Sequence, residues 1–595
     1  MVHRPGLRSH EAGSVTEADV DTEVTVVGWV QRRRDHGGIA FLDVRDGSGI
    51  VQVVADPDEH PGVGDLKMEY CIRVDGVVRL RPSGTENPDL PTGMVEIGAD
   101  EIEVLAPAKT LPFMIDDRTE VDELTRLRYR YLDLRRPKMA ANLRARSRAT
   151  SAIRRTLDDL GFLEVETPTL VNSTPEGARD MLVPSRLRQG EFYALPQSPQ
   201  LFKQLLMVSG VERYFQIARC YRDEDFRADR QLEFTQLDLE GAFWDRDDVL
   251  ATIEEVLVAV AREIRGVDVE LPFKRLTWQE AMDRYGSDKP DIRFGMEIVD
   301  LSEVVAGSEF GVFAGAIEAG GTVRGINAGS QDWPRSRADN MTERAKELGA
   351  KGLVWMVVED DGQLRSPVAK FLSEQEQAEI KGRLGGEPGD VLLISADAWR
   401  TVVTVLGGLR LDLGRPSGHD EFAFLWVVDF PLFEEEDDGS ITFSHHPFTS
   451  PASLDEMRDN PEQALSKAYD VVLNGVELGS GSIRIHDPDV QRQVFEILGI
   501  DAETANRRFG WFLEALDYGT PPHGGFAFGI DRLVMILQGE ASIREVIPFP
   551  KTQTGLDPMT EAPTWVDDTQ LRELGIDLTA DSKLRRDGTD TGEES

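Results

Sequence analysis

The sequence predicts a multidomain α+β protein, and three observations lead to that prediction. The chain has 595 residues, enough for several domains at roughly 100–200 residues each. Short β-rich runs separated by turns fill residues 20–105, and helical and strand-like segments are mixed beyond them. From about residue 291 to 411 the pattern changes again, with Gly-rich turns and apolar runs of its own. We therefore predict a small N-terminal β-barrel, a mixed core, and a module inserted into that core.

Composition and charge exclude several classes of protein. The chain has 66 Lys and Arg against 107 Asp and Glu, so its formal net charge is −41. That balance argues against a generic polyanion binder, and any nucleic-acid role must depend on local basic patches. Two cysteines exclude a disulfide framework, and 40% hydrophobic residues exclude a wholly disordered chain. Without a signal-peptide pattern or a run of about 20 apolar residues, we expect a cytoplasmic protein with no membrane partner.

The N-terminal segment has the pattern of a small barrel. Five β-rich runs largely alternate apolar with polar residues, and turns rich in glycine and proline separate them. Five strands at this spacing fit an OB-fold. The runs are Val24–Val30, Ile39–Arg45, Ile50–Ala55, Tyr70–Leu80 and Val95–Leu105. We place this barrel at residues 1–106 and a connector at 107–139.

The remaining chain divides where its pattern changes. A helical segment, Ala140–Leu160, opens the mixed region, and Gly161 ends that helix. After the inserted module, a buried-strand pattern resumes at Phe422–Asp429. The last segment, Asp581–Ser595, is polar enough to predict disorder. The predicted divisions are a first mixed region at 140–290, the insertion at 291–412, a second mixed region at 413–565 and a C-terminal extension at 566–595.

Three stretches are the most informative about chemistry. The first is a helix stop, a strand, and a proline that cannot donate to a central ladder. The second is a pair of alternating strands around a charged loop, and Gln236, Asp238 and Glu240 share one face of its second strand. A sheet face with only polar groups usually lines a ligand site. The third is a Gly-rich strand, which lets a ligand approach the backbone, before a helix that Arg532 opens. The stretches are Gly161–Leu170, Phe215–Glu240 and Gly524–Leu533.

Together, and in this order, these stretches resemble the three signature motifs of class II aminoacyl-tRNA synthetases. Further stretches are similar to aspartyl-tRNA synthetases, and the inserted module points to the bacterial type. These are Ser173–Asp180, Gln197–Gln204, His445–Thr449 and Asn474–His486. The resemblance covers residues 1 to about 565. It implies an OB-fold anticodon-binding domain, an antiparallel class II catalytic core in two parts, and an inserted α+β domain of the bacterial GAD-like kind.

The resemblance also implies a reaction. An enzyme of this family would use ATP to ligate L-aspartate to tRNA(Asp) through an aspartyl-adenylate intermediate, releasing AMP and diphosphate. The two steps would be in-line displacements, and the resemblance names no protein nucleophile. Positioning and charge stabilisation, with Arg222 and Arg532 in the catalytic roles, would then produce the rate enhancement.

The aspartate-binding residues that the resemblance implies make physical sense. Arg484 would offer a planar fork, and Lys203 a point charge, to the side-chain carboxylate of the substrate. Asp238 would orient both cations. His445 resembles the mobile histidine of the family, and His446 beside it is the weaker candidate. The other members of this set, which include acceptors for the substrate ammonium, are Glu176, Ser198, Gln200 and Arg222.

The same motifs imply an ATP site. Arg222 would clamp the α-phosphate, where negative charge grows during attack. Phe234 and Arg532 would lie on opposite faces of the adenine. Asp470 and Glu477 would coordinate Mg²⁺ between the phosphates. Further ATP contacts are implied for Asp223, Glu224, Gln231, Glu477, Gly529, Ile530 and Asp531.

The barrel carries candidate anticodon contacts. The basic turn Gln31–Gly38 precedes Phe41, and an aromatic platform with hydrogen-bonding groups suits unstacked bases. The positions implied are Arg34, His36, Phe41, Gln52 and Gly84. Relatives that also charge tRNA(Asn) tend to carry histidine at this turn and an Arg-Pro-x-Gly-Thr loop, which is Arg81–Thr85 here. We therefore predict an enzyme for both tRNA(Asp) and tRNA(Asn), with restriction to tRNA(Asp) as the alternative.

Further partners follow from the same resemblance. Asp-tRNA(Asn) would require a partner amidotransferase, and Glu164–Pro168 matches the dimer motif of the family, so we expect a homodimer. Nine cations lie between Arg126 and Arg148 against one acid, Asp133. This run fits a path for the tRNA backbone and, equally, ion pairs across a dimer interface.

Three rival interpretations are weaker. A lysyl enzyme would need acids where Arg484 stands, and an asparaginyl enzyme would not need Lys203 beside it. An ammonia-dependent asparagine synthetase would leave the anticodon-like barrel unexplained. A non-catalytic RNA-binding relative would be expected to lose Arg222, Arg484 or Arg532, and all three are present.

Overall fold

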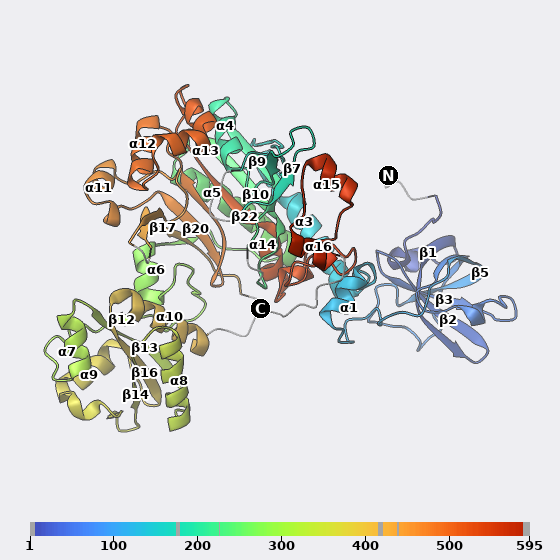
Figure 1. Cartoon of the computed structure of the whole chain (residues 1–595). Coiled ribbons are helices and arrows are strands. Elements are labelled where there is room, and N and C mark those ends of the chain that lie inside the picture. Colours follow the sequence, from blue (N-terminus) through green and yellow to red (C-terminus); the bar gives the residue numbers. More distant parts are fainter. Residues whose placement is uncertain (1–5, 174–178, 225–226, 415–420, 437–438, 587–595) are drawn as a thin grey trace. The chain divides into compact units, whose positions relative to one another are not determined.

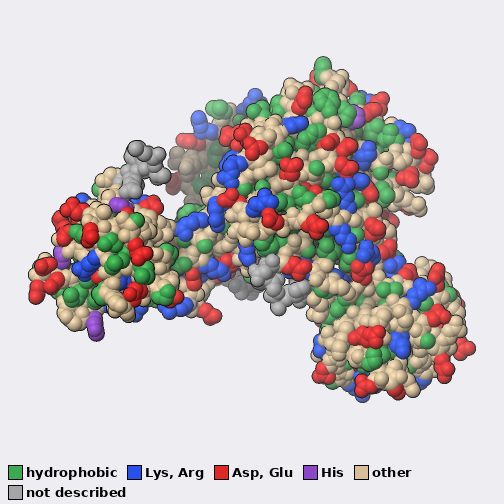
Figure 2. Space-filling view, turned by 180° about the vertical axis from the view of Figure 1, so that it is seen from behind, with side chains coloured by type: hydrophobic (Ala, Val, Ile, Leu, Met, Phe, Trp, Pro, Cys, Tyr) green, Lys and Arg blue, Asp and Glu red, His purple; other side chains and the backbone are tan. Residues whose placement is uncertain are grey.

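The computed structural model describes residues 6–173, 179–224, 227–414, 421–436 and 439–586. The chain forms two compact units, Met1–Lys138 and Met139–Ser595. Figure 1 shows their elements. Among the helices of the described segments, none combines the length and the apolar character that crossing a membrane requires. On the face shown in Figure 2, acidic side chains are spread over much of the surface, with Lys and Arg side chains between them.

The first unit contains the predicted barrel. Its five strands form a closed barrel in the order β1-β2-β3-β5-β4, with valine, leucine and isoleucine side chains inside. β1 extends past its predicted end at Val30, because Arg32–His36 continue to pair with β2. The strands are β1 Glu23–His36, β2 Ile39–Arg45, β3 Ile50–Ala55, β4 Cys71–Leu80 and β5 Val95–Ala106. Two short helices follow, α1 Glu123–Arg128 and α2 Arg130–Asp133.

Several arginines of the basic run between Arg126 and Arg148 form ion pairs inside this unit. Arg126, Arg130 and Arg136 all contact the fully buried Asp133, at 2.9, 2.6 and 3.4 Å. Arg135 reaches Glu69 at 2.8 Å. A buried carboxylate needs such partners, because an unpaired charge is costly away from water. These four arginines therefore serve internal ion pairs, a use that neither sequence interpretation of the run included.

The second unit is built around an eight-stranded sheet. Its strand order is β11-β17-β20-β21-β22-β10-β9-β6. Neighbouring strands are antiparallel except at the two ends, where β11 with β17 and β6 with β9 are parallel. The strands are β6 Leu163–Glu164, β9 Arg213–Tyr221, β10 Glu233–Ala242, β11 Lys274–Thr277, β17 Phe424–Val428, β20 Ala468–Leu473, β21 Val476–Ile483 and β22 His523–Gly529.

Helices cover one face of this sheet, and the part of the other face formed by β10 is polar. α3 Pro137–Asp159, α5 Arg246–Arg265 and α14 Ile530–Gln538 share one hydrophobic core with the sheet. Leu237 and Leu239 of β10 belong to that core, so the residues between them point to the opposite face. The predicted polar face of Gln236, Asp238 and Glu240 therefore exists, and it is where the candidate site lies.

The inserted module is a three-layer unit. Its five strands have the order β12-β13-β16-β14-β15. Helices α8 and α10 pack on one face of this sheet and α7 and α9 on the other, as Figure 1 shows. The elements are β12 Val299–Asp300, α7 Gly311–Glu318, β13 Thr322–Ser330, α8 Arg335–Glu347, β14 Val354–Val358, β15 Leu364–Arg365, α9 Glu374–Arg383, β16 Asp390–Asp397 and α10 Trp399–Gly414.

The remaining elements frame the site and the C-terminal extension. The elements before α15 are β7 Leu182–Pro184, β8 Phe192–Ala194, α4 Gln200–Val208, α6 Trp278–Tyr285, β18 Phe433–Glu435, β19 Ile441–Phe443, α11 Leu454–Asp459, α12 Pro488–Ile497 and α13 Ala502–Leu516. The extension has α15 Asp568–Leu574 and α16 Ala580–Arg586. α16 falls within the segment for which the sequence predicts disorder. Ion pairs of Arg586 with Asp568 and of Lys583 with Asp577 accompany it.

Candidate functional site

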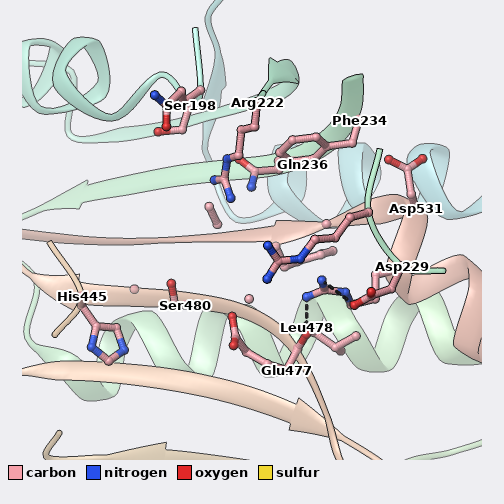
Figure 3. Close-up of a pocket in the computed structure, with 18 of the residues that line it drawn as sticks. Ser198, Arg222, Asp229, Phe234, Gln236, His445, Glu477, Leu478, Ser480 and Asp531 are labelled. Atoms are coloured by element: carbon pink, nitrogen blue, oxygen red, sulfur yellow. Dashed lines mark hydrogen bonds and ion pairs between the residues drawn. The ribbon is translucent and has the colours of Figure 1, made fainter. Parts of the chain in front are cut away.

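A cavity of about 640 Å³ lies on the polar face of the central sheet. Figure 3 shows side chains entering it from opposite sides, with Arg222 and Phe234 facing His445 and Glu477. Predicted residues that line it are Ser198, Gln200, Lys203, Arg222, Glu224, Gln231, Phe234, His445, Glu477, Arg484, Gly529, Asp531 and Arg532. Asp223, Asp238, Asp470 and Ile530 are not among its lining residues. Glu176 lies outside the described residues.

At one end of the cavity, two cations and two carboxylates are buried together. Lys203 Nζ lies 2.5 Å from Asp238 Oδ1 and 3.2 Å from Glu240 Oε2. Arg484 donates from Nε to Glu240 Oε1 at 2.8 Å and from Nη2 to Oε2 at 3.2 Å. None of the four side chains is more than 5% exposed. We call Lys203, Asp238, Glu240 and Arg484 the closed end.

The carboxylates of the closed end differ in their acidity. Burial raises the pKa of Asp238, against the opposing pull of Lys203. Burial acts in the same direction on Glu240, but Arg484 and Lys203 outweigh it and hold the pKa of Glu240 below its ordinary value. Asp238 Oδ2 and Gln200 Nε2 are buried and, within the described part of the chain, have no hydrogen-bond partner. Buried polar atoms without partners beside a cavity are suited to receive a ligand.

Glu240 is the functional residue that the sequence reasoning missed. The sequence predicts that Asp238 orients both Lys203 and Arg484, whereas in the structure Arg484 donates to Glu240 instead. The reason is strand order: β10 pairs with β22, and Glu240 stands opposite Gly525 at the level where Arg484 follows β21. The available signal was its place on the same polar face as Gln236 and Asp238.

The other end of the cavity holds cations with weaker partners. The Arg222 guanidinium lies 5.1 Å from the centre of the Phe234 ring and 4.0 Å from Glu224. Arg230 contacts Glu224 at 2.8 Å, and Arg532 contacts Asp229 at 3.0 Å. Arg532 also donates to the Glu477 carbonyl at 2.7 Å. We call Arg222, Glu224, Arg230, Phe234 and Arg532 the open end.

Two histidines at the cavity have opposite electrostatic character. His445 Nε2 lies 3.2 Å from Asp470 Oδ1. Burial alone would lower the pKa of His445, but Asp470 and then Glu477 raise it above its ordinary value. Burial lowers the pKa of His446 to about 3, and the nearby Arg484 and Lys203 act in the same direction. His445 is thus the histidine suited to carry charge, and His446 stays neutral near pH 7.

Asp470 and Glu477 are the only pair predicted to bind a metal. Burial raises the pKa of Glu477, and the negative charge of Asp470 adds to that effect. A buried carboxylate whose charge is disfavoured by a neighbouring carboxylate fits a bound cation. Among the described residues, no group of three or more His, Cys, Asp and Glu side chains is placed to hold a metal. A cation here would therefore need ligands from a bound molecule as well as from the protein.

Two features of the predicted site have close partners within the protein. Asp531 lines the cavity, and both of its carboxylate oxygens have partners: one accepts from Arg146 and the other from the Thr235 N–H at 2.7 Å. Figure 3 shows this carboxylate turned away from Glu477. Gly525 of the Gly-rich strand has a close neighbour in the protein itself. A Cβ at Gly525 would lie 1.8 Å from Glu240 Oε2, so this glycine makes room for Glu240.

The predicted anticodon residues of the barrel lie on its outer side. Arg34 stands opposite Phe41, and Asp43 opposite Gln52, and cross-strand partners share a face. Arg34 donates to Asp43 at 2.9 Å and to Gln52 at 3.3 Å. Phe41 is half-buried and outside the barrel core. His36 and Gly84 are exposed, and Gly84 has a left-handed φ of 89°.

Comparison with known proteins identifies relatives over almost the whole chain. An aspartate–tRNA(Asp/Asn) ligase of Moorella thermoacetica is 55% identical over 583 residues, which cover 96% of this chain and 97% of the relative. One of Thermobifida fusca is 51% identical, covering 96% and 98%. Among solved structures, asparaginyl-tRNA synthetase from Pyrococcus horikoshii with asparaginyl-adenylate has a TM-score of 0.57 at 20% identity, covering 93% of this chain and 99% of that one. Aspartyl-tRNA synthetase from Entamoeba histolytica has a TM-score of 0.55 at 19% identity, covering 92% of each chain.

The family models agree with the fold. A model of the OB-fold nucleic acid binding domain matches residues 24–105, which contain the closed barrel. A model described as tRNA synthetases class II (D, K and N) matches residues 122–553, which contain the central sheet and the cavity. The predicted OB-fold and the predicted antiparallel class II core are both confirmed. This chain therefore belongs to the class II tRNA synthetases of the D, K and N group.

Proposed function

We propose that this protein uses ATP to ligate L-aspartate to tRNA(Asp) and to tRNA(Asn) through an aspartyl-adenylate intermediate. The observation that carries the proposal is the closed end. Two buried cations, each fixed by a buried carboxylate, adjoin a cavity large enough for an amino acid and a nucleotide. The names of the relatives, aspartate–tRNA(Asp/Asn) ligases, support the same activity.

Aspartate binding would use the closed end as a preformed carboxylate site. The substrate side chain would contact Lys203 Nζ and the Arg484 guanidinium. Asp238 and Glu240 would position these two cations, and their own negative charges would disfavour a second negative charge on the substrate side chain. Ser198 and Gln200 line the neighbouring wall, where the ammonium group would bind. Glu176, which lies outside the described residues, is the other acceptor proposed for this group. A lysine side chain would bring a third cation into this end, which disfavours it.

ATP would occupy the open end. Arg222 would leave the Phe234 ring to contact the α-phosphate, and the ring would then be available to one face of the adenine. Arg532 would contact the other face. Gln231 is already oriented, because it donates to the Lys551 carbonyl at 3.1 Å and accepts from the Lys551 N–H at 2.8 Å. Glu224 lines the same end, and Asp223, Gly529 and Ile530 would contribute from their backbone.

Mg²⁺ would bind at Asp470 and Glu477. The raised pKa of Glu477 beside Asp470 fits a site that gains stability when a cation binds. Since these are two carboxylates, phosphate oxygens of ATP would supply further ligands. When bound, the ion would reduce the negative charge on the departing diphosphate.

The reaction would proceed in two displacement steps. A carboxylate oxygen of aspartate forms a bond to the α-phosphorus, and the bond from that phosphorus to the diphosphate oxygen breaks. The ribose hydroxyl at the tRNA terminus then attacks the carbonyl carbon of the adenylate, AMP leaves with the electrons of the mixed-anhydride bond, and the hydroxyl proton is lost to a phosphate oxygen of the AMP or to water. Arg222 stabilises the charge that develops at the α-phosphate, and Lys203 with Arg484 fixes the nucleophile relative to it.

The anticodon would be bound by the barrel. Arg34, Phe41 and Gln52 lie on one outer face, where the half-buried ring of Phe41 and hydrogen-bonding groups suit unstacked bases. His36 and Gly84 would face the base that differs between the two tRNAs. Restriction to tRNA(Asp) is the alternative, and the Asp/Asn names of the relatives do not favour it. Charging both tRNAs would require an amidotransferase downstream.

The enzyme would act in the cytoplasm as a homodimer. The segment Glu164–Pro168 begins in β6, the parallel edge strand of the central sheet, and Leu163 beside it is exposed. An exposed apolar side chain on an unpaired edge is suited to an interface between two copies. Sedimentation of the purified protein would measure the assembly directly, and a monomer at micromolar concentration would contradict this part of the proposal.

Aspartate-dependent pyrophosphate–ATP exchange tests the core of the proposal. Exchange should require aspartate, with asparagine and lysine inactive, and should be measured with and without tRNA. Charging of a tRNA(Asn) transcript with labelled aspartate tests the specificity, and His36→Leu should shift charging towards tRNA(Asp). Charging of tRNA(Asn) far below that of tRNA(Asp) by the unmodified protein would leave only the restricted alternative.

A further inference from the structure

We propose that Arg146, on the long helix α3, is a positioning residue for ATP binding and acts through Asp531. The inference rests on the proposed use of the open end for ATP. Arg146 is not among the residues that line the cavity, and its side chain is only 16% exposed. Its effect on the nucleotide would therefore be indirect.

The geometry links three separate segments of the chain at one point. Arg146 Nη1 contacts Asp531 Oδ1, and Arg146 Nη2 donates to Thr235 Oγ1 at 3.0 Å. Asp531 Oδ2 accepts from the Thr235 N–H at 2.7 Å. Each of the three groups thus contacts the other two. The result is a closed, almost fully buried triangle between α3, β10 and the start of α14.

The position of this triangle gives it a function. Asp531 directly precedes Arg532, and Thr235 directly follows Phe234. These neighbours are the two residues proposed to enclose the adenine. Because adjacent side chains on a strand point to opposite faces, Thr235 faces α3 while Phe234 faces the cavity. Fixing Asp531 against Thr235 therefore fixes the separation between the two adenine-binding side chains.

A second contact holds α3 in register with this region. Asn142, one turn before Arg146, is buried and donates to Glu540 Oε1 at 2.9 Å and to the Glu545 carbonyl at 3.1 Å. Residues four apart lie on the same helix face. Arg146 therefore contacts the start of α14 at Asp531, and Asn142 contacts the segment after the end of α14 at Glu540 and Glu545. These contacts at two positions on one face of α3 resist rotation and sliding of the helix, and so they fix the position of the Arg146 guanidinium.

Further contacts link Thr235 to β9, the strand that pairs with β10. Arg219 donates to Thr235 Oγ1 at 3.2 Å and pairs with Glu233 at 2.5 Å, and Lys551 pairs with Glu233 at 3.1 Å. The backbone of Lys551 in turn holds the amide of Gln231. Arg146 is thus the more buried of the two arginines that contact Thr235, on the face of β10 opposite to the cavity. From there it would support the open end without contacting the nucleotide.

The experiment measures ATP binding directly, by calorimetry with ATP and Mg²⁺ in the absence of aspartate, and then the exchange kinetics. For Arg146→Met we expect the Kd and the KM for ATP to rise about tenfold, with the KM for aspartate within about twofold of the unmodified protein. Arg146→Lys retains the charge but not the fork, so an intermediate loss is expected. Arg155→Met is the matched control, because Arg155 lies on the same helix with a 62% exposed side chain and pairs only with Glu263 in the described contacts.

A double variant keeps the inference testable if Arg146→Met is unstable. Asp531→Asn combined with Arg146→Met removes the unpaired buried charge, which should restore stability, while ATP affinity should stay about tenfold weak. Unchanged ATP affinity in the folded double variant, or equal losses for ATP and aspartate, would overturn the inference. If the unmodified protein binds ATP but shows no aspartate-dependent exchange, the proposed function fails. The comparison of ATP affinities then still decides the role of Arg146.

Discussion

The two ends of the cavity differ in how their charges are stabilised. At the closed end, every charged group is buried and contacts an opposite charge that is also buried. At the open end, the side chains of Arg222 and Arg230 are 35% and 44% exposed, and Arg222 contacts an aromatic ring in place of a close carboxylate. The first arrangement resists movement, whereas the second can exchange its partners for phosphate groups.

The difference follows from the cost of desolvation. Removing one partner of a buried ion pair costs about 3–5 kcal/mol, because it leaves a charge without water or a counter-ion. An exposed pair is worth only about 0–1 kcal/mol. A rigid charge arrangement suits the selection of one small amino acid by its carboxylate. A set of loosely paired arginines suits a larger ligand whose charge distribution changes during the reaction.

The largest effect is expected at the closed end. Arg484→Met removes both hydrogen bonds from Arg484 to the buried Glu240 and leaves Lys203, at 3.2 Å, as its remaining opposite charge, so the free energy of unfolding should fall by about 3–5 kcal/mol. Aspartate-dependent exchange should fall at least about 100-fold. Urea unfolding and exchange kinetics measure the two quantities. Adding Glu240→Gln should recover part of the stability but not the activity. A stability loss below about 1 kcal/mol in the single variant would show that the closed end is not a set of interdependent charges.

At the open end, activity and stability should separate. Arg222→Met removes a cation from the proposed transition-state contact, and exchange should fall about 100- to 1,000-fold. Since Arg222 is partly exposed and contacts mainly the Phe234 ring, the free energy of unfolding should change by less than about 0.5 kcal/mol. The same two measurements apply. A loss of stability comparable to that of Arg484→Met would remove the distinction between the ends.

His446, the neutral histidine near Arg484 and Lys203, should give stability a pH dependence. Burial lowers the pKa of His446 to about 3 in the folded state, whereas an unfolded histidine titrates near its ordinary 6.5. Below pH 6.5 the unfolded state therefore binds a proton that the folded state does not, and stability is lost as the pH falls from 6.5 towards 3. His446→Gln should reduce that loss, by at most about 1.4 kcal/mol per pH unit. Urea unfolding of both proteins at pH 6.5 and 5.5 measures it, and equal slopes would contradict the assignment of a neutral His446.

The smallest effect is expected for the exposed pair of the open end. Arg230→Gln removes the 2.8 Å contact with Glu224, which water can replace on both partners. The free energy of unfolding should change by less than about 0.5 kcal/mol, and high salt should reduce the difference further, because it screens exposed charges. A change above about 1.5 kcal/mol would mean that Arg230 contributes to stability in the way the closed end does.

Local sequence patterns predicted the parts of the site that depend on one segment. The period of two in β10 placed Gln236, Asp238 and Glu240 on one face, because alternation is a property of a single strand. The barrel strands were predicted for the same reason, apart from the extension of β1 to His36. His445, the preferred histidine, lies 3.2 Å from Asp470 Oδ1, and its role as the mobile histidine stays a prediction.

The contacts that were not predicted join segments that are distant in the chain. The partner of Arg484 is Glu240 because of the register of β10 against β22, which no local pattern specifies. Asp531 is committed to Arg146 for the same reason, since α3 and α14 meet only in the folded core. The basic run from Arg126 to Arg148 illustrates the same point. Its positive charge can be read from the sequence, but the ion pairs that three of its arginines form with Asp133 are visible only in the fold.

Gly525 restricts how this site can be redesigned. Any side chain there would collide with Glu240 Oε2, the atom that accepts from Arg484 Nη2. Enlarging Gly525 alone would displace the carboxylate, and shortening Glu240 alone would leave a buried guanidinium without its partner. Whichever of Gly525 and Glu240 is substituted first, the single variant has a disrupted pocket. The effect of a change at one position therefore depends on the residue at the other, which makes the two positions epistatic. Directed evolution towards another amino acid would therefore need libraries that vary both positions at once.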